Sequence, residues 1–336
     1  MKYQSKVALL LLLITALSQV SYAGMKETIE NEITENQFEI IEDEGFVTEE
    51  TKKEGLVISG SLGPQFVFEN KKEQWGRNKS YQYSPVVGVI SFPEYDLSTT
   101  LEIKRAINKW QPLTGKERIN KSWEFQIQPR YYLGYYLGAP TDLVGEINTI
   151  LEKRPDNGKY EETELFIGFA QRRPNLYSEV RYAHLYTLTD DAWNDNIRTQ
   201  GDGFDLTIKP FIQKGAYQLE TEFYYKLQQR WNLPTGWGQT YTEYHITPGI
   251  IYDFGGGHKL SFRTEFGLKK EERKGVNVDD EMFYWKATLG YDFMITENLG
   301  GLIELEYERD KKSRTGNPVL EKTTIKKVTA ALNYRF

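Results

Sequence analysis

Cysteine is absent from the 336 residues of this protein, and histidine occurs only three times. Disulfide frameworks, iron–sulfur clusters and cysteine-based zinc sites are therefore excluded, because all of them need thiolates. After the first 23 residues the chain has no run of about 18 apolar residues, which is what a membrane-spanning helix requires. Aromatic residues are abundant, with 7 Trp, 23 Tyr and 17 Phe, so the composition is not that of a disordered chain.

Residues 1–23 have the pattern of a secretory signal peptide. Lys2 and Lys6 precede an apolar run of 11 residues, and small residues stand before the cleavage predicted at Gly24. The run is shorter than the roughly 20 residues of a transmembrane anchor, which is the alternative. We therefore predict an exported bacterial protein.

Residues 24–54 hold the acidity of the mature chain. This segment has 11 acidic residues and 3 lysines, whereas residues 55–336 have 37 acidic and 37 basic side chains. The simplest interpretation is a solvated periplasmic arm. A short helix is an open alternative, and a plug in a pore is disfavoured because the segment has little apolar surface to hold it there.

From residue 55 onward the hydrophobic pattern has a period of two. Leu97, Leu101 and Ile103 share one face of a segment whose other face carries Glu102 and Lys104. Such alternation predicts a strand with one apolar and one hydrophilic side. The same pattern predicts fourteen strands, at residues 56–68, 81–92, 95–107, 121–133, 142–153, 160–171, 176–188, 203–213, 216–229, 241–254, 259–270, 281–293, 299–309 and 322–336.

The predicted connections alternate in length. Short turns with Gly, Pro and Asn separate one set of neighbouring strands. Longer polar loops, none above about 15 residues, are predicted for the other set, at residues 69–80, 108–120, 189–202, 230–240, 271–280 and 310–321.

A closed transmembrane antiparallel β-barrel explains these features together. The predicted strands are longer than the mean strand of globular proteins, which has about five to six residues. They are also long enough to span a bilayer, which takes about 9 to 11 residues of a tilted strand. Lipid offers no hydrogen bonds, so membrane strands must close into a ring that is apolar outside and wet inside. An even strand number places both termini at one end, expected to be the periplasmic end. A soluble all-β protein is the alternative.

The aromatic residues are predicted to form two outward belts at the membrane interfaces. The periplasmic belt comprises Tyr131, Tyr252, Phe254, Tyr291, Phe293, Tyr334 and Phe336, and the opposite belt comprises Trp123, Tyr160, Phe204, Tyr225, Tyr244, Phe283 and Tyr307. Four outward cations at the loop-rich end, Arg105, Lys270, Arg309 and Lys326, are expected to reach lipopolysaccharide phosphates.

The final strand, from Lys327 to Phe336, has apolar residues at alternate positions and ends in phenylalanine. It resembles the terminal assembly signal of outer-membrane proteins, in which Tyr334 and Phe336 would be recognised by the barrel-assembly machinery. Together with residues 285–293 and 302–308, it is similar to the last three strands of the monomeric, fourteen-stranded outer membrane protein G porins. The fusobacterial major porins are a second group of similar style. This resemblance implies a porin in the cell outer membrane, surrounded by lipid and lipopolysaccharide. A monomer is expected, because no predicted strand lacks lipid-facing apolar residues.

Fourteen strands are expected to enclose an aqueous channel, because eight leave a filled interior and 16 to 18 leave an open one. The predicted function is passive diffusion of small hydrophilic solutes, such as ions and sugars. The strand register assigns these residues to the pore lining: Gln65, Glu102, Lys104, Glu124, Gln128, Arg130, Glu146, Glu164, Arg181, Asp205, Lys209, Glu220, Glu222, Lys226, Glu243, His245, Arg263, Glu265, Lys286, Glu304, Glu306, Lys327 and Arg335.

Two arrangements of these charges are compatible with the sequence. Acids concentrate on strands 160–171, 216–229 and 299–309, whereas the cations Lys259, Arg263, Lys269 and Lys286 form a basic sector. Opposed walls would set up a transverse field across the pore. Cross-strand ion pairs that stiffen the wall are the alternative. A porin function predicts weak selectivity.

Other functions find less support in the sequence. His184 lies in the lipid-facing register, His258 follows a glycine turn, and only His245 points inward, so a catalytic or metal site is not expected. No cofactor or nucleic-acid partner is expected either. A channel for oligosaccharides or hydrophobic compounds, or a surface adhesin, remains an alternative, because five loop tryptophans could stack on sugars: Trp75, Trp110, Trp193, Trp231 and Trp237.

Overall fold

The computed structural model describes residues 58–155, 158–191, 194–233, 238–274, 278–315 and 317–336. The predicted signal peptide and acidic arm, as well as Trp193 and Trp237, lie outside the described residues. The described part contains no helix that is both long and apolar enough to cross a membrane.

Fourteen strands make up almost all of the described chain. Their bounds are β1 Ser59–Glu73, β2 Gly76–Phe92, β3 Leu97–Pro112, β4 Arg118–Tyr136, β5 Ala139–Lys153, β6 Lys159–Arg173, β7 Leu176–Asp191, β8 Asn194–Lys214, β9 Tyr217–Leu233, β10 Gly238–Gly255, β11 His258–Arg273, β12 Val278–Met294, β13 Leu299–Arg314 and β14 Asn317–Arg335. A single-turn 3₁₀ helix, η1 Pro93–Tyr95, joins β2 to β3.

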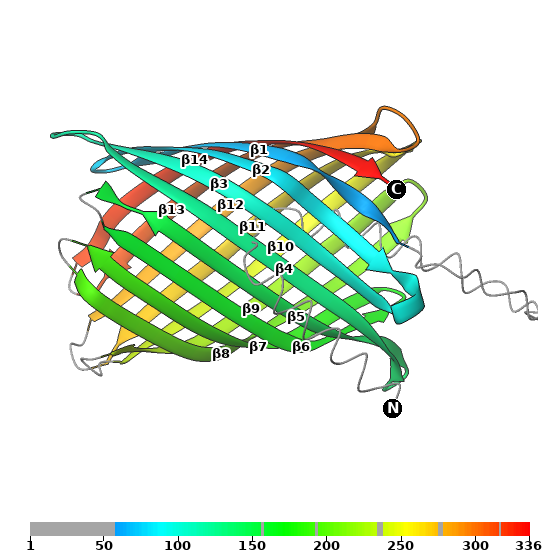
Figure 1. The fold of residues 1–336 in the computed structure, drawn as a ribbon, viewed down its shortest axis with the longest axis horizontal. Helices are drawn as coiled ribbons and strands as arrows, with labels where there is room; N and C mark the ends of the chain where they lie inside the picture. The colour runs from blue at the N-terminus through cyan, green and yellow to red at the C-terminus, as the bar shows by residue number, and fades with distance from the viewer. Residues whose placement is uncertain (1–57, 156–157, 192–193, 234–237, 275–277, 316) are drawn as a thin grey trace, which may run out of the picture.

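The strands form one closed antiparallel barrel in which each strand pairs with its sequence neighbours and β1 pairs with β14. At this seam Gly60 and Phe336 exchange two backbone hydrogen bonds, of 3.1 and 3.0 Å. The strands are steeply tilted against the barrel axis, and β1 begins at the end of the barrel where β14 stops (Figure 1). We call this the terminal end, and the opposite one the distal end. The predicted fold is confirmed.

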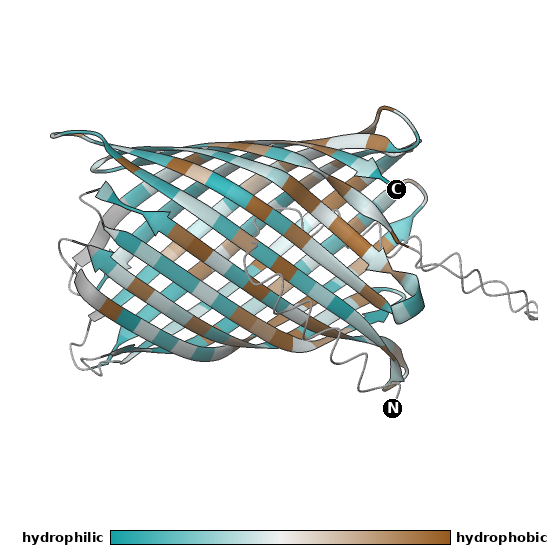
Figure 2. Cartoon of the chain, in the orientation of Figure 1, coloured by the Kyte–Doolittle hydropathy of each residue, from teal (hydrophilic) through white to brown (hydrophobic). Residues whose placement is uncertain are grey.

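Alternation along each strand separates an outer apolar face from an inner polar one. On β6, Leu165, Ile167 and Phe169 are exposed, whereas Phe166 and Ala170, at positions of the opposite parity, are buried. Figure 2 shows the same alternation of hydrophobic and hydrophilic segments along strands throughout the barrel. Lipid is the medium in which so many exposed apolar side chains are stable.

Outward rings gather near both ends of the apolar band. At the terminal end Tyr217 packs against Tyr252 at 4.7 Å between centroids. Tyr334 and Phe336 are exposed at the same end, at the β1–β14 seam. Tyr160 differs from the prediction. Its hydroxyl donates to Glu162 and its ring faces Arg154, so it belongs to the inner register of β6, opposite in parity to Leu165.

The prediction of long polar loops was wrong. Two to five residues separate successive strands at both ends, and most of the predicted loop residues continue the strands, including Trp110 on β3 and Trp231 on β9. The strands have 15 to 21 residues, more than the roughly 9 to 11 that a bilayer needs. Polar residues beyond the apolar band keep their cross-strand hydrogen bonds, so the barrel wall extends into water at its distal end.

We predict that a charge on the outer face is far more disruptive at mid-barrel than at the distal rim. Leu305 is outward and 48% exposed on β13, so Leu305→Arg should lower the free energy of unfolding in lipid vesicles by about 2–4 kcal/mol. Ser313→Arg, at an outward position of the same strand near its distal end, is the matched control and should change little. Equal losses from both substitutions in a denaturant titration would contradict this placement of the membrane.

Candidate functional site

Ion pairs that bridge across an intervening strand identify the inner wall. Arg181 on β7 reaches Glu146 on β5 at 2.5 Å, and Arg263 on β11 reaches Glu220 on β9 at 3.1 Å. Strands β6 and β10 lie between these partners. Side chains converge on the concave face of a barrel and diverge on the convex face, so such contacts form only inside.

Arg181 is the centre of a cluster of charged side chains. Its guanidinium contacts Asp205 with two nitrogens, at 3.0 and 2.7 Å, and also lies 3.1 Å from Glu179. The ring of Phe166 lies beneath it, 4.4 Å from the guanidinium carbon to the centroid. Arg181 is buried and has three carboxylate partners, counting Glu146, so it holds β5, β7 and β8 together.

The cluster continues toward the terminal end through Arg130 on β4. This side chain lies 3.3 Å from Asp142 and 3.5 Å from Glu179, and it donates a hydrogen bond of 3.1 Å to the Tyr177 hydroxyl. Arg172 shares Asp142 at 3.0 Å. Cations and carboxylates therefore alternate along this part of the wall.

A second group of inner ion pairs is centred on strands β9 to β12 and includes partners on β6 and β8. Glu220 binds both Lys209 at 3.4 Å and Arg263 at 3.1 Å. The neighbouring pairs are Lys269 with Glu243 at 3.2 Å, Lys286 with Glu265 at 2.6 Å, and Lys226 with Glu164 at 2.6 Å.

His245, the inward histidine, is part of this group. It lies 3.3 Å from Glu222 and 3.8 Å from Glu265, and its ring stacks on Tyr224 at 4.7 Å. Of the other two histidines, His184 is outward and lies 2.8 Å from Asp202, and His258 lies 3.0 Å from the Tyr291 hydroxyl. Within the described ranges, no three His, Asp or Glu side chains form a group suited to a metal ion.

The predicted basic sector is divided among these pairs. Each of its four cations has a carboxylate within 4.0 Å, including Lys259, which lies 3.9 Å from Asp253. The geometry therefore matches cross-strand ion pairs, the second of the two arrangements compatible with the sequence. A lining in which opposite charges are interleaved has a modest mean field.

Glycines at inward positions make the bridging contacts possible. Gly249 pairs directly with both Glu220 and Arg263, and a Cβ there would lie 2.9 Å from the Arg263 Cγ. Gly267 lies under Tyr284, whose hydroxyl reaches Glu243 at 3.3 Å on the far side of β11. Long side chains lie flat over these glycines instead of projecting into the lumen.

The inner wall around the β1–β14 seam, across the barrel from Arg181 on β7, is partly apolar. Val87 and Val89 on β2, Leu302 on β13 and Ala331 on β14 form a buried inward cluster. Farther toward the distal end, Lys104 pairs with Glu124, the Ser84 hydroxyl donates to Glu102, and Lys327 lies 3.4 Å from Glu306. The lining therefore changes character around its circumference.

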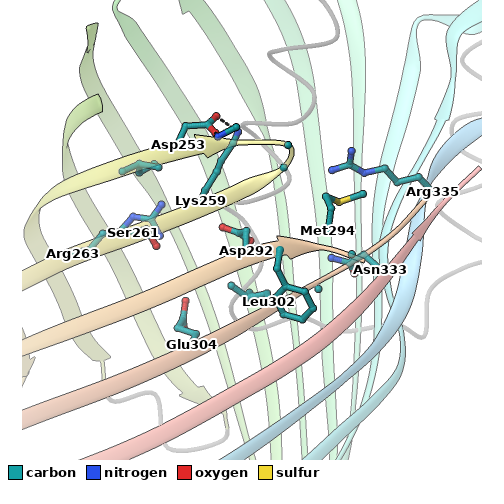
Figure 3. A pocket seen from close by; sticks show the side chains of 17 residues that line it. Asp253, Lys259, Ser261, Arg263, Asp292, Met294, Leu302, Glu304, Asn333 and Arg335 are labelled. Atoms are coloured by element: carbon teal, nitrogen blue, oxygen red, sulfur yellow. Dashed lines mark hydrogen bonds and ion pairs between the residues drawn. The ribbon is translucent and has the colours of Figure 1, made fainter. Parts of the chain in front are cut away.

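A recess of about 310 Å³ opens at the terminal end beside this cluster. Figure 3 shows its side chains on β10 to β14, with Leu302 and Met294 among polar neighbours. Predicted lining residues Arg263, Glu304 and Arg335 contribute to it. A recess lined by both apolar side chains and charged or amide groups suits a polar organic solute better than a bare ion.

The sequence-based prediction of the pore lining did not include several residues of the inner wall. Asp142 and Glu179 have the inward parity but lie near strand ends, where predicted boundaries are least certain. Phe166 was overlooked because an inward ring contradicts a simple polar lining. The bridging glycines do carry a signal, since glycine inside a long strand indicates a close approach by another group.

We predict that removing the central cation destabilises the barrel and shifts its selectivity. Arg181→Met leaves three carboxylates near one another without their guanidinium, which should cost about 3–5 kcal/mol of unfolding free energy. The reversal potential in a salt gradient should move toward cation preference. Lys270→Met, which breaks an exposed outer pair with Glu272, should leave both measurements unchanged. An unaltered reversal potential for Arg181→Met would show that Arg181 does not face the conducting path.

A second prediction concerns the glycine under Tyr284. A Cβ in Gly267→Ala would lie 2.3 Å from the Tyr284 ring, so the ring must leave the wall, and single-channel conductance should fall. The double variant Gly267→Ala with Tyr284→Ala should recover it. Gly238→Ala, whose nearest neighbour would be 3.5 Å away, is the control. Equal conductance in all variants would place Tyr284 outside the narrow part of the pore.

Residues 166–333, half of the chain, match the model of a protein family described as "CymA: Putative cyclodextrin porin". No curated protein matches the sequence. Similar solved structures include OccK1 (OpdK) of Pseudomonas aeruginosa, at 10% identity and a TM-score of 0.36, covering 84% of this chain and 100% of that one. An anion-selective porin from Comamonas acidovorans has 12% identity and a TM-score of 0.35, with coverages of 84% and 99%. A deltaS2 mutant of the monoaromatic hydrocarbon channel TodX has 8% identity and a TM-score of 0.47, with coverages of 84% and 90%.

Proposed function

Because this chain belongs to the CymA family of porins and is an outer-membrane channel for small solutes, we propose that ions and sugars cross its barrel by passive diffusion. The inner wall of paired charges carries this proposal. Its long side chains are held against the wall by their partners, which leaves the centre of the barrel to water. The described strands are joined by two to five residues, too few to fold inward and block the pore.

The orientation of the chain belongs to the same proposal. Both termini would face the periplasm, with residues 1–23 removed as a signal peptide and residues 24–54 forming the acidic arm. Tyr334 and Phe336, exposed at the terminal end, would be read by the barrel-assembly machinery. Outward apolar residues occur on every side of the barrel, which favours a monomer surrounded by lipid and lipopolysaccharide.

An oligosaccharide-selective channel is the second candidate. The family description names cyclodextrin, and the wall offers inward tyrosines such as Tyr224 and Tyr284 beside charged groups. Sugar rings bind to such surfaces by stacking on aromatic faces while their hydroxyls bond to carboxylates and guanidinium groups. The recess beside Leu302 could accept part of an oligosaccharide at the periplasmic mouth.

The remaining alternatives have less support in the geometry. A channel for hydrophobic compounds needs an apolar path, whereas ion pairs line most of this wall. An adhesin usually presents long surface loops, and the distal connections here are short. We propose no catalytic role for the inward His245, which stacks on Tyr224, lies between two carboxylates and contacts the Tyr284 hydroxyl at 3.3 Å as part of the polar wall.

Planar-bilayer recording tests the proposal. The purified full chain should give a steady current proportional to voltage. Reversible reduction of that current by α-cyclodextrin or maltohexaose, at concentrations at which sucrose has no effect, would favour the oligosaccharide-selective channel. Current without saccharide block would support general diffusion and exclude the oligosaccharide-selective channel. A barrel that inserts but carries no current would overturn the porin proposal.

A further inference from the structure

A band of outward lysines and arginines runs along one side of the barrel near its distal end. These cations alternate with inward residues, so their side chains are on the outer face. The band, which we call the basic band, consists of Lys72, Arg77, Lys79, Arg105, Lys109, Lys121, Lys153, Lys159, Arg309, Lys311, Lys322 and Lys326.

The basic band begins where the distal aromatic belt ends. On β2, Lys79 is the next outward residue after Tyr81, and on β4, Lys121 is the next after Trp123. Arg105 lies over the Trp123 ring at 5.5 Å from the centroid. Rings of this kind mark the edge of the hydrocarbon region, so the band lies at the depth of lipid headgroups.

Cations of the basic band face one another directly. Five cross-strand pairs place two positive side chains at opposite positions: Lys72 with Arg77, Lys79 with Lys109, Lys121 with Lys153, Lys153 with Lys159, and Lys311 with Lys322. Opposite residues in a sheet have Cβ atoms about 4.5–5.5 Å apart, and like charges there are destabilising.

The band has no carboxylates of its own to offset this repulsion. Among the described residues, none of its twelve cations has a carboxylate oxygen within 4.0 Å, in contrast to the paired cations of the inner wall. The basic band lies on the distal halves of eight strands, β1 to β6, β13 and β14. Among the described residues of these strand halves, Glu161 on β6 is the single outward carboxylate. Outward acids occur instead on β11 and β12, where Glu272 lies opposite Asp279.

The ligand must therefore supply several negative charges at headgroup depth. A phospholipid with one phosphate would neutralise one cation of each pair, whereas a glycolipid with two phosphates could bridge neighbouring pairs. Arginine and lysine are well suited to phosphate, and their apolar stems can lie along the lipid-facing wall. We propose that the basic band is a binding site for a bisphosphorylated glycolipid of the leaflet at the distal end.

This site differs from the contacts expected from the sequence. Arg105, Arg309 and Lys326 belong to the band, but Lys270 is 2.5 Å from Glu272 on the opposite side of the barrel. The inference rests on the outer-membrane orientation proposed above. Binding in detergent solution does not depend on that orientation or on conductance, so the two proposals fail in different experiments.

Native mass spectrometry of the full chain, titrated with bisphosphorylated lipid A, monophosphoryl lipid A and phosphatidylglycerol, tests the site. The test variant carries Lys79→Gln, Lys109→Gln, Lys121→Gln and Lys153→Gln. The control removes the same charge from outward cations that face no other cation, with Arg173→Gln, Arg198→Gln, Lys214→Gln and Lys270→Gln. Circular dichroism establishes that both variants retain their strands.

The wild-type chain should bind lipid A more tightly than either singly phosphorylated lipid. The test variant should lose at least tenfold in affinity for lipid A, and the control less than twofold. Equal losses in both variants, or equal binding of phosphatidylglycerol and lipid A by the wild type, would overturn the proposal. Should the test variant fail to fold, the pair Lys121→Gln and Lys153→Gln replaces it, with an expected loss of about threefold and the same contradicting outcomes.

Discussion

Every backbone amide in the hydrocarbon layer needs a partner from the chain itself, because lipid provides none. The pairing of β1 with β14 meets this requirement, joining segments more than 250 residues apart in sequence. Once the ring is closed, each strand has a single register, and parity alone decides whether a side chain meets lipid or water. The exposed Leu165 and the buried Phe166 differ only in that parity.

Closure also brings charged side chains together on a concave surface. Carboxylates and cations on alternate strands come within contact distance there, and residues such as Arg181 and Glu220 acquire two or three partners each. A buried charge is costly unless it is paired. The interior therefore resolves into ion pairs lying along the wall, and the small residues beneath them, such as Gly249, determine how flat they lie.

Much of this could be predicted from the sequence, because the period-two pattern responds directly to the lipid on one side of the wall. Strand number, closure and the face of each charged residue follow from it. The partners do not follow, since Arg263 meets Glu220 across an entire strand and that contact depends on the stagger of three strands. A residue's parity carries no information about this stagger.

The loops were mispredicted for a related physical reason. Hydrophobic alternation fades where a strand leaves the membrane, because water on both faces permits polar residues at every position. Hydrogen bonding between the strands persists there, so β3 continues through Trp110 to Pro112. Tyr160 shows the same limit, because only the paired neighbours at a strand end establish which way its ring points.

The cations of the inner wall, which face water, and the cations of the basic band, which face lipid headgroups, have different surroundings. Inside, where water is available, lysines and arginines are nonetheless paired with carboxylates, since the curvature brings opposite charges into contact. Outside, at the edge of the lipid, where an unpaired charge is less well solvated, Lys121 and Lys153 face each other, and neither has a carboxylate oxygen within 4.0 Å among the described residues. A folded chain that keeps such repulsion at its surface needs an external source of negative charge, and at this depth the headgroups of the surrounding lipid are the nearest one.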